Sequence, residues 1–210
     1  TRESVDLSAI ELPELVNRKS HTGDGFMPYE AEPGSAPAFL PMGGTTLVRQ
    51  TSSTHGPDGY ITIDPQIISA TQQRLRNKIL DRADELSLFE ACHRPGAKVL
   101  SLSYGVTAKA AAEACRRLEG TGVPVSDLVL KTLWPVSRER IRKEARAYDT
   151  IVVPEMNLGQ YVEEIKKVLP DKKIIFHGRM DGTLIPPSDL MEIFSAAHHG
   201  SDLPAAGKEA

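Results

Sequence analysis

Short apolar runs alternate with amphipathic stretches along the C-terminal half of the chain. The apolar runs indicate strands at 98–104, 127–133, 151–153 and 173–176, because continuous apolar segments are typical of strands covered on both faces. Apolar residues at helical spacing indicate helices at 107–119, 137–148, 157–169 and 187–198. Strands joined by helices favour right-handed crossovers and a parallel sheet. The pattern therefore predicts a doubly wound, mostly parallel α/β domain over residues 97–198.

A well-defined boundary follows the third of these strands. Pro154 predicts the end of the strand, because proline cannot donate a hydrogen bond to a β-ladder. Asn157 is predicted to be the N-cap of the next helix, and Gln160 at N3 would complete a capping box. Met156 and Tyr161 are placed to form the hydrophobic staple of that helix.

The two ends of the chain follow a different pattern. Residues 1–45 are predicted to form an extended linker or arm, because glycine and proline are frequent in 21–45. Large apolar residues punctuate this arm and favour a position across a partner or another domain: Phe26, Met27, Tyr29, Phe39 and Leu40. Residues 199–210 are predicted to be a flexible tail.

Residues 46–96 are predicted to carry edge strands and a long connecting helix. The strands are expected at 46–51 and 60–63, and the first of them could join the main sheet as an antiparallel edge strand. The N-cap and proline signals at Asp64-Pro65 predict a helix that runs to about Glu90.

Composition narrows the function classes. With a net charge of −3 and charges of both signs interspersed, this chain of 210 residues is not expected to bind nucleic acid or an anionic membrane surface. No apolar run is long enough for a membrane span and no signal peptide is apparent, so we expect a cytoplasmic protein. Thr1 in place of methionine suggests a fragment, a cleaved product or the start of a split gene. Cys92 and Cys115 fit no metal-ligand spacing, and Cys115 is predicted to be a small buried hydrophobe.

Candidate chemistry falls at the turns that follow the strands, because ligands of open α/β sheets bind beyond the carboxyl ends of the strands. The turn at 104–107 places Gly105 and the Thr107 hydroxyl at a helix N-terminus, which is a candidate for anion binding. An ordinary tight turn is the favoured interpretation, because the Gly-x-Gly-x-x-Gly pattern is absent. The remaining turns lie at 132–135, 154–157 and 177–181.

Other side chains leave alternatives open. Glu155 is either a catalytic carboxylate or, as we favour, a local partner for backbone donors at the start of the following helix. Trp134 is interpreted as a domain-packing anchor rather than a stacking platform. The histidines are interpreted as solvent-facing, with a loop position for His55 and a tail position for His198-His199. We assign no catalytic residue and no metal site, because no Ser-His-Asp arrangement, Walker loop or cluster-binding cysteine set is present.

Three motifs carry a resemblance to a known family. Val99-Leu-Ser-Leu-Ser-Tyr-Gly-Val-Thr-Ala-Lys-Ala-Ala111, Leu130-Lys-Thr-Leu-Trp-Pro135 and Val152-Val-Pro-Glu-Met-Asn-Leu-Gly-Gln160 occur in this order. Together they resemble the alpha subunit of 2-oxoacid:ferredoxin oxidoreductases, especially the 2-oxoglutarate and branched-chain types. Phe39-Leu-Pro-Met-Gly-Gly44 and the Gly-Pro-Asp-Gly loop resemble the region before that subunit's second domain.

The resemblance implies a domain similar to the transketolase C-terminal domain, in an enzyme that makes acyl-CoA, CO2 and reduced ferredoxin from a 2-oxoacid, coenzyme A and oxidised ferredoxin. The family's thiamine-pyrimidine domain has no counterpart in this chain. By this resemblance, thiamine diphosphate with Mg would lie between that missing domain and a beta subunit, and the [4Fe-4S] cluster would belong to the beta subunit. A gamma subunit is a further candidate partner. This chain would then be a non-catalytic assembly portion, with 2-oxoglutarate as the expected oxoacid. The alternatives are a free-standing anion-binding α/β domain and an independent enzyme using Glu155 and His55.

Overall fold

The computed structural model describes residues 8, 11 and 19–202, and it divides into two compact units, Thr1–Asp81 and Arg82–Ala210. The predictions for the lead-in before residue 19 and for most of the tail after Gly200 concern residues outside the described ones. Among the described residues, no helix has the length and apolar content needed to cross a membrane.

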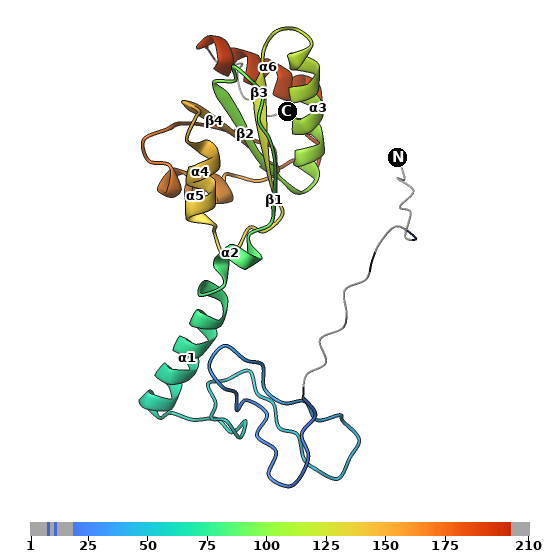
Figure 1. Cartoon of the computed structure of the whole chain (residues 1–210), viewed down its shortest axis with the longest axis vertical. Coiled ribbons are helices and arrows are strands. Elements are labelled where there is room, and N and C mark those ends of the chain that lie inside the picture. The colour runs from blue at the N-terminus through green and yellow to red at the C-terminus, as the bar shows by residue number, and fades with distance from the viewer. Residues whose placement is uncertain (1–7, 9–10, 12–18, 203–210) are drawn as a thin grey trace. The chain divides into compact units, whose positions relative to one another are not determined.

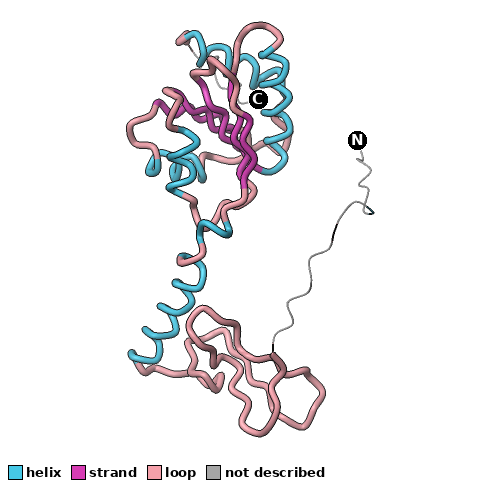
Figure 2. Tube along the Cα trace, viewed as in Figure 1, coloured by secondary structure: helices cyan, strands magenta, loops and turns pink. Residues whose placement is uncertain are grey.

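The second unit is built on a five-stranded sheet with the order β1-β3-β2-β4-β5 (Figures 1 and 2). The strands are β1 (Phe89–Cys92), β2 (Val99–Tyr104), β3 (Val125–Leu130), β4 (Thr150–Glu155) and β5 (Lys173–Gly178). Of the four pairings in this sheet, the one between β1 and β3 at the edge is antiparallel, while β2, β3, β4 and β5 run parallel. The predicted doubly wound, mostly parallel α/β fold is therefore confirmed.

Helices cover both faces of this sheet, as Figure 1 shows. They are α3 (Gly105–Glu119) and α6 (Pro187–His199) on one side, and α4 (Arg138–Ala145) and α5 (Gln160–Val168) on the other. Because successive strand residues point to opposite faces, Val99 and Val152 join Phe194 in one core, while Leu100 and Ile151 join the other. Cys115 is fully buried in the first core, which confirms its predicted role.

The long connecting helix is shorter than predicted. Helix α1 (Pro65–Leu80) begins where the sequence indicated, with the Asp64 carboxylate accepting bonds from two backbone amides. After α2 (Ala83–Leu86) the chain becomes strand β1, so the prediction of a helix to Glu90 was wrong. The open edge of β3 offers backbone partners from Leu130 to Asp127, and this long-range pairing overrides the local helical spacing.

The two strands predicted in the N-terminal part do not form. Residues 46–51 have no strand structure, and the edge of the sheet is occupied by β1 instead. Residues 60–63 contribute a single isolated bridge, between His55 and Ile61. An apolar stretch becomes a strand only where a neighbouring strand completes its hydrogen bonds.

Strand β4 continues through Pro154, which the sequence predicted to end it. The pairing of β2 with β4 stops at Ser101↔Val152, whereas β5 pairs with β4 as far as Glu155. The Glu155 carbonyl accepts a bond from the Arg179 amide at 3.0 Å, so Pro154 faces the side where pairing has already ended. The missing N–H therefore removes no ladder bond.

The described part of the first unit has little regular structure apart from α1. Tyr29 organises part of it: its amide donates to the Pro57 carbonyl at 3.1 Å, and its hydroxyl accepts a bond from the Thr51 amide at 3.3 Å. The Arg49 guanidinium lies 4.0 Å from the centre of the Tyr60 ring. The backbone is close-packed at Gly59, where an added Cβ would lie 2.7 Å from the Arg49 carbonyl oxygen.

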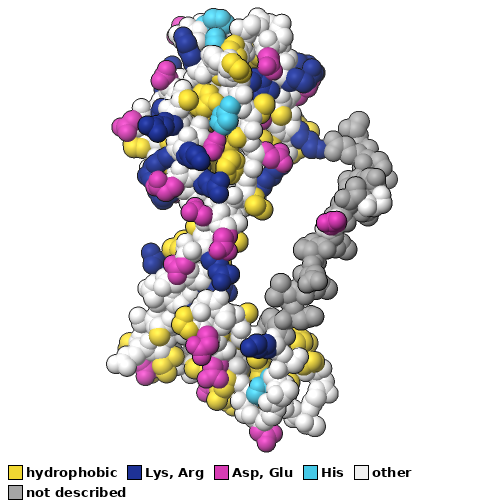
Figure 3. All heavy atoms as spheres, in the orientation of Figure 1, with side chains coloured by type: hydrophobic (Ala, Val, Ile, Leu, Met, Phe, Trp, Pro, Cys, Tyr) yellow, Lys and Arg dark blue, Asp and Glu magenta, His cyan; other side chains and the backbone are white. Residues whose placement is uncertain are grey.

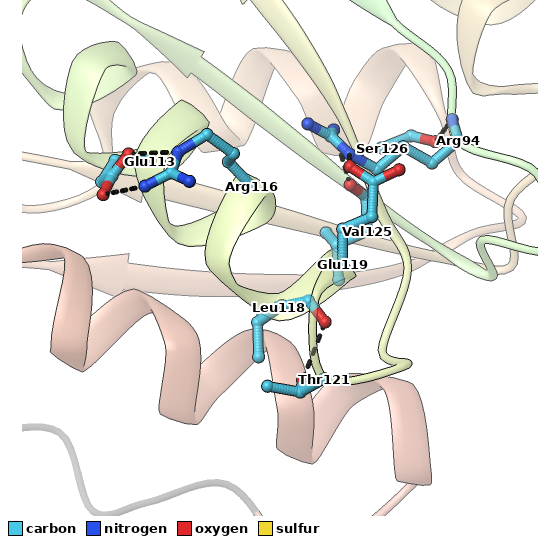
Figure 4. A network of polar contacts seen from close by, with 8 residues as sticks. All are labelled: Arg94, Glu113, Arg116, Leu118, Glu119, Thr121, Val125 and Ser126. Atoms are coloured by element: carbon cyan, nitrogen blue, oxygen red, sulfur yellow. Dashed lines mark hydrogen bonds and ion pairs between the residues drawn. The ribbon is translucent and has the colours of Figure 1, made fainter.

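Arg94 ties together the edge of the sheet at which the parallel strands begin (Figure 4). Its Nε donates to Glu119 at 2.9 Å and its Nη1 donates to the Val125 carbonyl at 3.0 Å. Its amide donates to the Ser126 hydroxyl at 2.8 Å. These bonds join the loop before β2 to the end of α3 and the start of β3, so this edge has a structural role.

Candidate functional site

The opposite edge, where the parallel strands end, contains the point at which the strand order reverses. The chain goes from β2 to β3 on one side of β2, and then crosses to β4 on the other side. Tyr104 ends β2 and Glu155 ends β4, so both lie at this switch point. Crevices at switch points are where open α/β sheets commonly bind ligands.

A buried hydrogen-bond network occupies the switch point. The Tyr104 hydroxyl donates to Glu155 Oε2 at 3.2 Å and accepts a bond from Asn157 Nδ2 at 3.0 Å. The Tyr161 amide donates to the same Glu155 oxygen at 3.1 Å. The rings of Tyr104 and Tyr161 meet edge to face, with centroids 5.4 Å apart. The favoured interpretation of Glu155, as a partner for backbone donors of the next helix, agrees with this geometry.

The start of α5 differs from the predicted capping box. The helix begins at Gln160, and its N-cap is Gly159 with a φ of 94°. Asn157 Oδ1 instead accepts from the amides of Gly159 at 2.7 Å and Gln160 at 3.1 Å, which makes a turn just before the helix. Gln160 is therefore the first helical residue, not N3. Glycine adopts the left-handed backbone conformation without steric strain, so Gly159 allows this extra turn before the helix.

The predicted hydrophobic staple was also wrong. Met156 packs against the core beneath α3 and α6, whereas Tyr161 packs against the core beneath α4 and α5. Because α5 begins at Gln160, Tyr161 is its second residue and Met156 does not precede the N-cap directly, so the two do not occupy the staple positions.

The Glu155 carboxylate is held inside the protein. Its side chain is 1% exposed, and among the described residues no group bonds its second oxygen, Oε1. Burial, together with the charge of Glu155, raises the pKa of Tyr104 to about 12. Burial likewise raises the pKa of Tyr161 to about 12. Both tyrosines therefore stay protonated at neutral pH, and Tyr104 keeps its role as a donor to the carboxylate.

The turn proposed for anion binding lies beside the network. Gly105 has a φ of 59° and Thr107 is buried, and none of the described side chains caps the start of α3. An open hollow of about 460 Å³ lies next to this turn, and its walls are mainly apolar. Its lining includes Val106, Thr107, Met156, Leu184, Ile185 and Pro186. Anion binding at Gly105 and Thr107 therefore stays a prediction.

Among the described residues, the hydrogen-bond network at the switch point includes none of the candidate histidines. His55 is half-buried rather than solvated: its ring centroid is 3.7 Å from that of Tyr29, and Nδ1 lies 2.7 Å from the Ser53 carbonyl. His55 belongs to the first unit and Glu155 to the second. His199 is exposed as predicted, but His198 is half-buried, and burial lowers its pKa. Among the described residues, no group of three or more His, Cys, Asp or Glu side chains could hold a metal ion.

Trp134 is not an anchor within the described chain, because its side chain is 67% exposed. It follows β3 and is held on a loop whose Leu133 carbonyl accepts a bond from the Tyr161 hydroxyl at 3.2 Å. The sequence suggested burial because tryptophan is usually covered, and only the structure shows its indole in solvent.

Sequence reasoning missed a buried acid, Asp127. This residue lies in the middle of β3, opposite Ser101 of β2, and it is 5% exposed. Burial raises the pKa of its carboxyl group from 3.8 to about 6, although the nearby charge of Arg94 acts in the other direction. The available signal was an aspartate inside an otherwise apolar strand, which the prediction had placed at a strand end.

Comparisons with known proteins identify this domain. Residues 97–190 match the family described as "Pyruvate:ferredoxin oxidoreductase core domain II". The 2-oxoglutarate synthase subunit KorA of Methanothermobacter thermautotrophicus is 27% identical over 165 residues, covering 76% of this chain and 44% of that protein. The subunit of the same name from Methanocaldococcus jannaschii is 30% identical over 145 residues, covering 68% of this chain and 38% of that protein. The chain thus spans less than half the length of these curated relatives.

A solved structure shows the same fold. It is the 2-oxoglutarate:ferredoxin oxidoreductase of Magnetococcus marinus with 2-oxoglutarate, coenzyme A and succinyl-CoA bound, and it matches with a TM-score of 0.73 at 22% identity. The match covers 88% of this chain and 33% of that chain, so it includes part of the first unit as well as the second. Residues 97–190 therefore carry core domain II of the pyruvate:ferredoxin oxidoreductase type, and the resemblance to 2-oxoacid:ferredoxin oxidoreductase subunits is confirmed.

Proposed function

We propose that this chain is the part of a KorA-type subunit that supports assembly of a 2-oxoglutarate:ferredoxin oxidoreductase and supplies no catalytic group of its own. The whole enzyme would convert 2-oxoglutarate and coenzyme A to succinyl-CoA and CO2, while two electrons pass to ferredoxin. The names of the KorA relatives and of the Magnetococcus marinus structure support this substrate. We place the complex in the cytoplasm, together with its ferredoxin.

The burial and hydrogen bonding of Glu155 support the proposal that this chain supplies no catalytic group. It is the acidic residue at the switch point, where a catalytic carboxylate would be expected, yet it is 1% exposed. One of its oxygens is shared between the Tyr104 hydroxyl and the Tyr161 amide. A general acid or base must come within hydrogen-bonding distance of its substrate. A carboxylate that is enclosed and used to hold a helix start does not meet that condition.

The iron–sulfur cluster of the proposed enzyme does not fit the cysteines of this chain. A [4Fe-4S] cluster needs about four cysteine thiolates, whereas the chain has 2 cysteines, and Cys115 is fully buried. Burial also raises the pKa of the Cys115 thiol to about 12, which disfavours the thiolate that a metal requires. In this proposal the cluster, thiamine diphosphate and Mg are bound by other polypeptide regions, namely the thiamine-pyrimidine domain and the beta subunit.

The first unit supplies support for an assembly role. A hollow of about 700 Å³ lies within it, lined by apolar side chains that include Phe26, Pro28, Phe39, Leu40, Met42 and Val48. Phe39 is 46% exposed, although a buried phenylalanine would contribute roughly 1.5–3 kcal/mol to stability. We propose that residues 21–45 lie across another subunit or domain of the complex, with a gamma subunit as a further candidate partner.

Activity of the purified complex tests the proposal. The chain is isolated with its natural partners, and reduction of a viologen dye is measured with coenzyme A and each of three oxoacids: 2-oxoglutarate, pyruvate and 2-oxoisovalerate. We expect 2-oxoglutarate to give the highest kcat/KM and the separated 210-residue chain to give no reduction. Turnover by the separated chain would contradict the assembly role, and a preference for another oxoacid would change the substrate.

A free-standing anion-binding domain is the alternative, and the uncapped start of α3 at Gly105 is the observation that favours it. Binding of inorganic phosphate there would raise the melting temperature of the isolated chain, with an increase that grows as the logarithm of the phosphate concentration above the Kd. Thr107→Val, which removes the hydroxyl, would abolish that increase. A melting temperature unaffected by millimolar phosphate would exclude this alternative.

A further inference from the structure

Large apolar side chains are exposed just after each of the parallel strands, at the edge where these strands end. We name them the carboxyl-edge patch, and they are Leu88, Val106, Leu133, Trp134, Leu158, Met180 and Leu184. These side chains are between 37% and 74% exposed. Single exposed apolar residues are common on proteins, but a group that follows one edge is typical of a protein interface.

The sheet topology brings the members of the patch into one row. Val106, Leu133-Trp134, Leu158 and Met180 follow β2, β3, β4 and β5 respectively, and these strands end at the same edge. Leu88 joins them because β1 is antiparallel and its first residue, Phe89, lies opposite Leu130 at the end of β3. Neighbouring strands are about 4.8 Å apart, so loops from adjacent strands contact a common surface.

Hydrogen bonds hold these loops in place. The Arg179 guanidinium donates to the Leu184 carbonyl at 2.9 Å, and the Tyr161 hydroxyl donates to the Leu133 carbonyl at 3.2 Å. The Thr132 hydroxyl donates to the Leu86 carbonyl at 2.6 Å. Loops that are already ordered lose less conformational entropy when they bind, which favours a protein partner.

Three ion pairs within the chain lie beside the patch. Lys131 lies 3.3 Å from Glu90, and Arg179 lies 2.7 Å from Asp189. Arg138 is 3.7 Å from Glu164. A surface whose charges are neutralised in this way matches an uncharged apolar partner surface, and it gives no excess of positive charge for a nucleic acid or a phosphate.

The hollow beside Val106 offers a place for a partner side chain. Leu184 and Val106 both line it, so part of the patch is concave while Trp134 stands out from the surface. Protein interfaces are commonly centred on an aromatic residue of one partner and an apolar pocket of the other. This patch has both elements.

We infer that the carboxyl-edge patch binds the portion of a KorA-type subunit that lies outside the region matched by this chain. The relatives are more than twice as long as the matched region, since it covers 44% of one and 38% of the other. We assign that additional polypeptide as the partner that covers the patch, because the patch is apolar and has no excess charge. The inference rests on the proposed function, because it takes the partner from the same subunit type.

Photocrosslinking in the full chain tests this contact. Trp134→benzoylphenylalanine and Leu158→benzoylphenylalanine place a photoreactive side chain on the patch, in cells that make the natural complex. Cys92→benzoylphenylalanine is the matched control, because Cys92 is exposed and lies at the opposite edge, beside Asp127. We expect crosslinked peptides from positions 134 and 158 that match the additional KorA region, at least about tenfold above those from position 92.

Crosslinks to a second copy of this chain, to an unrelated protein, or at no more than the control level would overturn the inference. Trp134→Ser and Leu158→Ser are expected to lower recovery of the same partner at least about tenfold, with unchanged melting temperatures, because both side chains are mainly in solvent. Activity of the wild-type complex separates the two proposals. Crosslinks without 2-oxoglutarate turnover would contradict only the proposed function. Turnover without crosslinks would contradict only the proposed contact at the patch.

Discussion

The two units of this chain place their apolar side chains differently. All buried hydrophobic side chains of the described residues lie between Val99 and Ala197, within the α/β unit. In the first unit, Met42 is 92% exposed and Ile63 is 91% exposed, and Figure 3 shows apolar side chains at the surface of residues 19–64. Apolar residues alone therefore do not produce a core.

Regular secondary structure accounts for the difference. Strands and helices satisfy their own backbone groups and present one apolar face, so two layers can be packed together without unpaired amides. The glycine- and proline-rich backbone of 21–45 forms no such face. Its structure depends on a few local contacts, such as those of Tyr29, and its apolar residues remain available to a partner.

Hydrogen exchange should show the largest difference between the units. In the isolated chain, amides of β2 and β4 are expected to exchange at least about a thousandfold more slowly than those of residues 26–40, because only global unfolding exposes a central strand. Mass spectrometry after a range of labelling times measures both. In the assembled complex we expect residues 26–40 to become protected. Equal, fast exchange of this segment in both forms would show that it is a plain tether.

Truncating one phenylalanine in each unit compares their packing. Phe194→Ala should lower the unfolding free energy by about 3–5 kcal/mol, because Phe194 is fully buried between α6 and the sheet. Phe39→Ala, at a side chain that is 46% exposed, should cost less than about 1 kcal/mol in the isolated chain. Urea unfolding followed by circular dichroism measures both. Similar costs would mean that the first unit has a core of its own.

Removing a buried charge should stabilise the α/β unit. Because the pKa of Asp127 is raised from 3.8 to about 6, the folded state keeps a proton between these values that the unfolded state has lost. The unfolding free energy therefore falls as the pH rises from 3.8 to about 6. Above about pH 6 the ionised carboxylate of Asp127 keeps the folded state destabilised. Asp127→Asn should gain up to about 3 kcal/mol at pH 7.5 and little near pH 4.

The control for this charge is Asp24→Asn, at an exposed carboxylate of the first unit. This substitution should leave the unfolding free energy unchanged within about 0.5 kcal/mol at every pH measured. Urea titrations at pH 4, 5.5 and 7.5 give the comparison. A gain for Asp127→Asn that is the same at every pH would mean that ionisation of this carboxyl group is not its cause.

The smallest expected effect concerns the turn before α5. Asn157→Ala removes the acceptor for the amides of Gly159 and Gln160 and the donor to the Tyr104 hydroxyl. Loss of comparable capping bonds costs about 0.5–2 kcal/mol. We expect a lower melting temperature and an unchanged kcat for the assembled complex at a temperature where the variant is folded. Lost activity with an unchanged melting curve would contradict the structural role of Asn157.

The amino-acid sequence determined much of the α/β unit. Continuous apolar runs indicated β2 and β5 within a few residues, and helical spacing indicated α3 and α6, because these patterns state directly which side chains can share a face. The Asp64-Pro65 signal located the start of α1, since capping involves only neighbouring residues. The motifs also carried the family resemblance.

Tertiary structure decided the features that depend on distant partners. Phe89–Cys92 became a strand because β3 lay beside it, and β4 continued through Pro154 because β2 had already left that side. Glu155 became enclosed when Tyr104, 51 residues earlier in the chain, donated to it. Trp134 remained in solvent because no element of the described chain covers its loop. Local pattern sets which face is apolar, whereas burial and pairing arise only when separate elements are brought together.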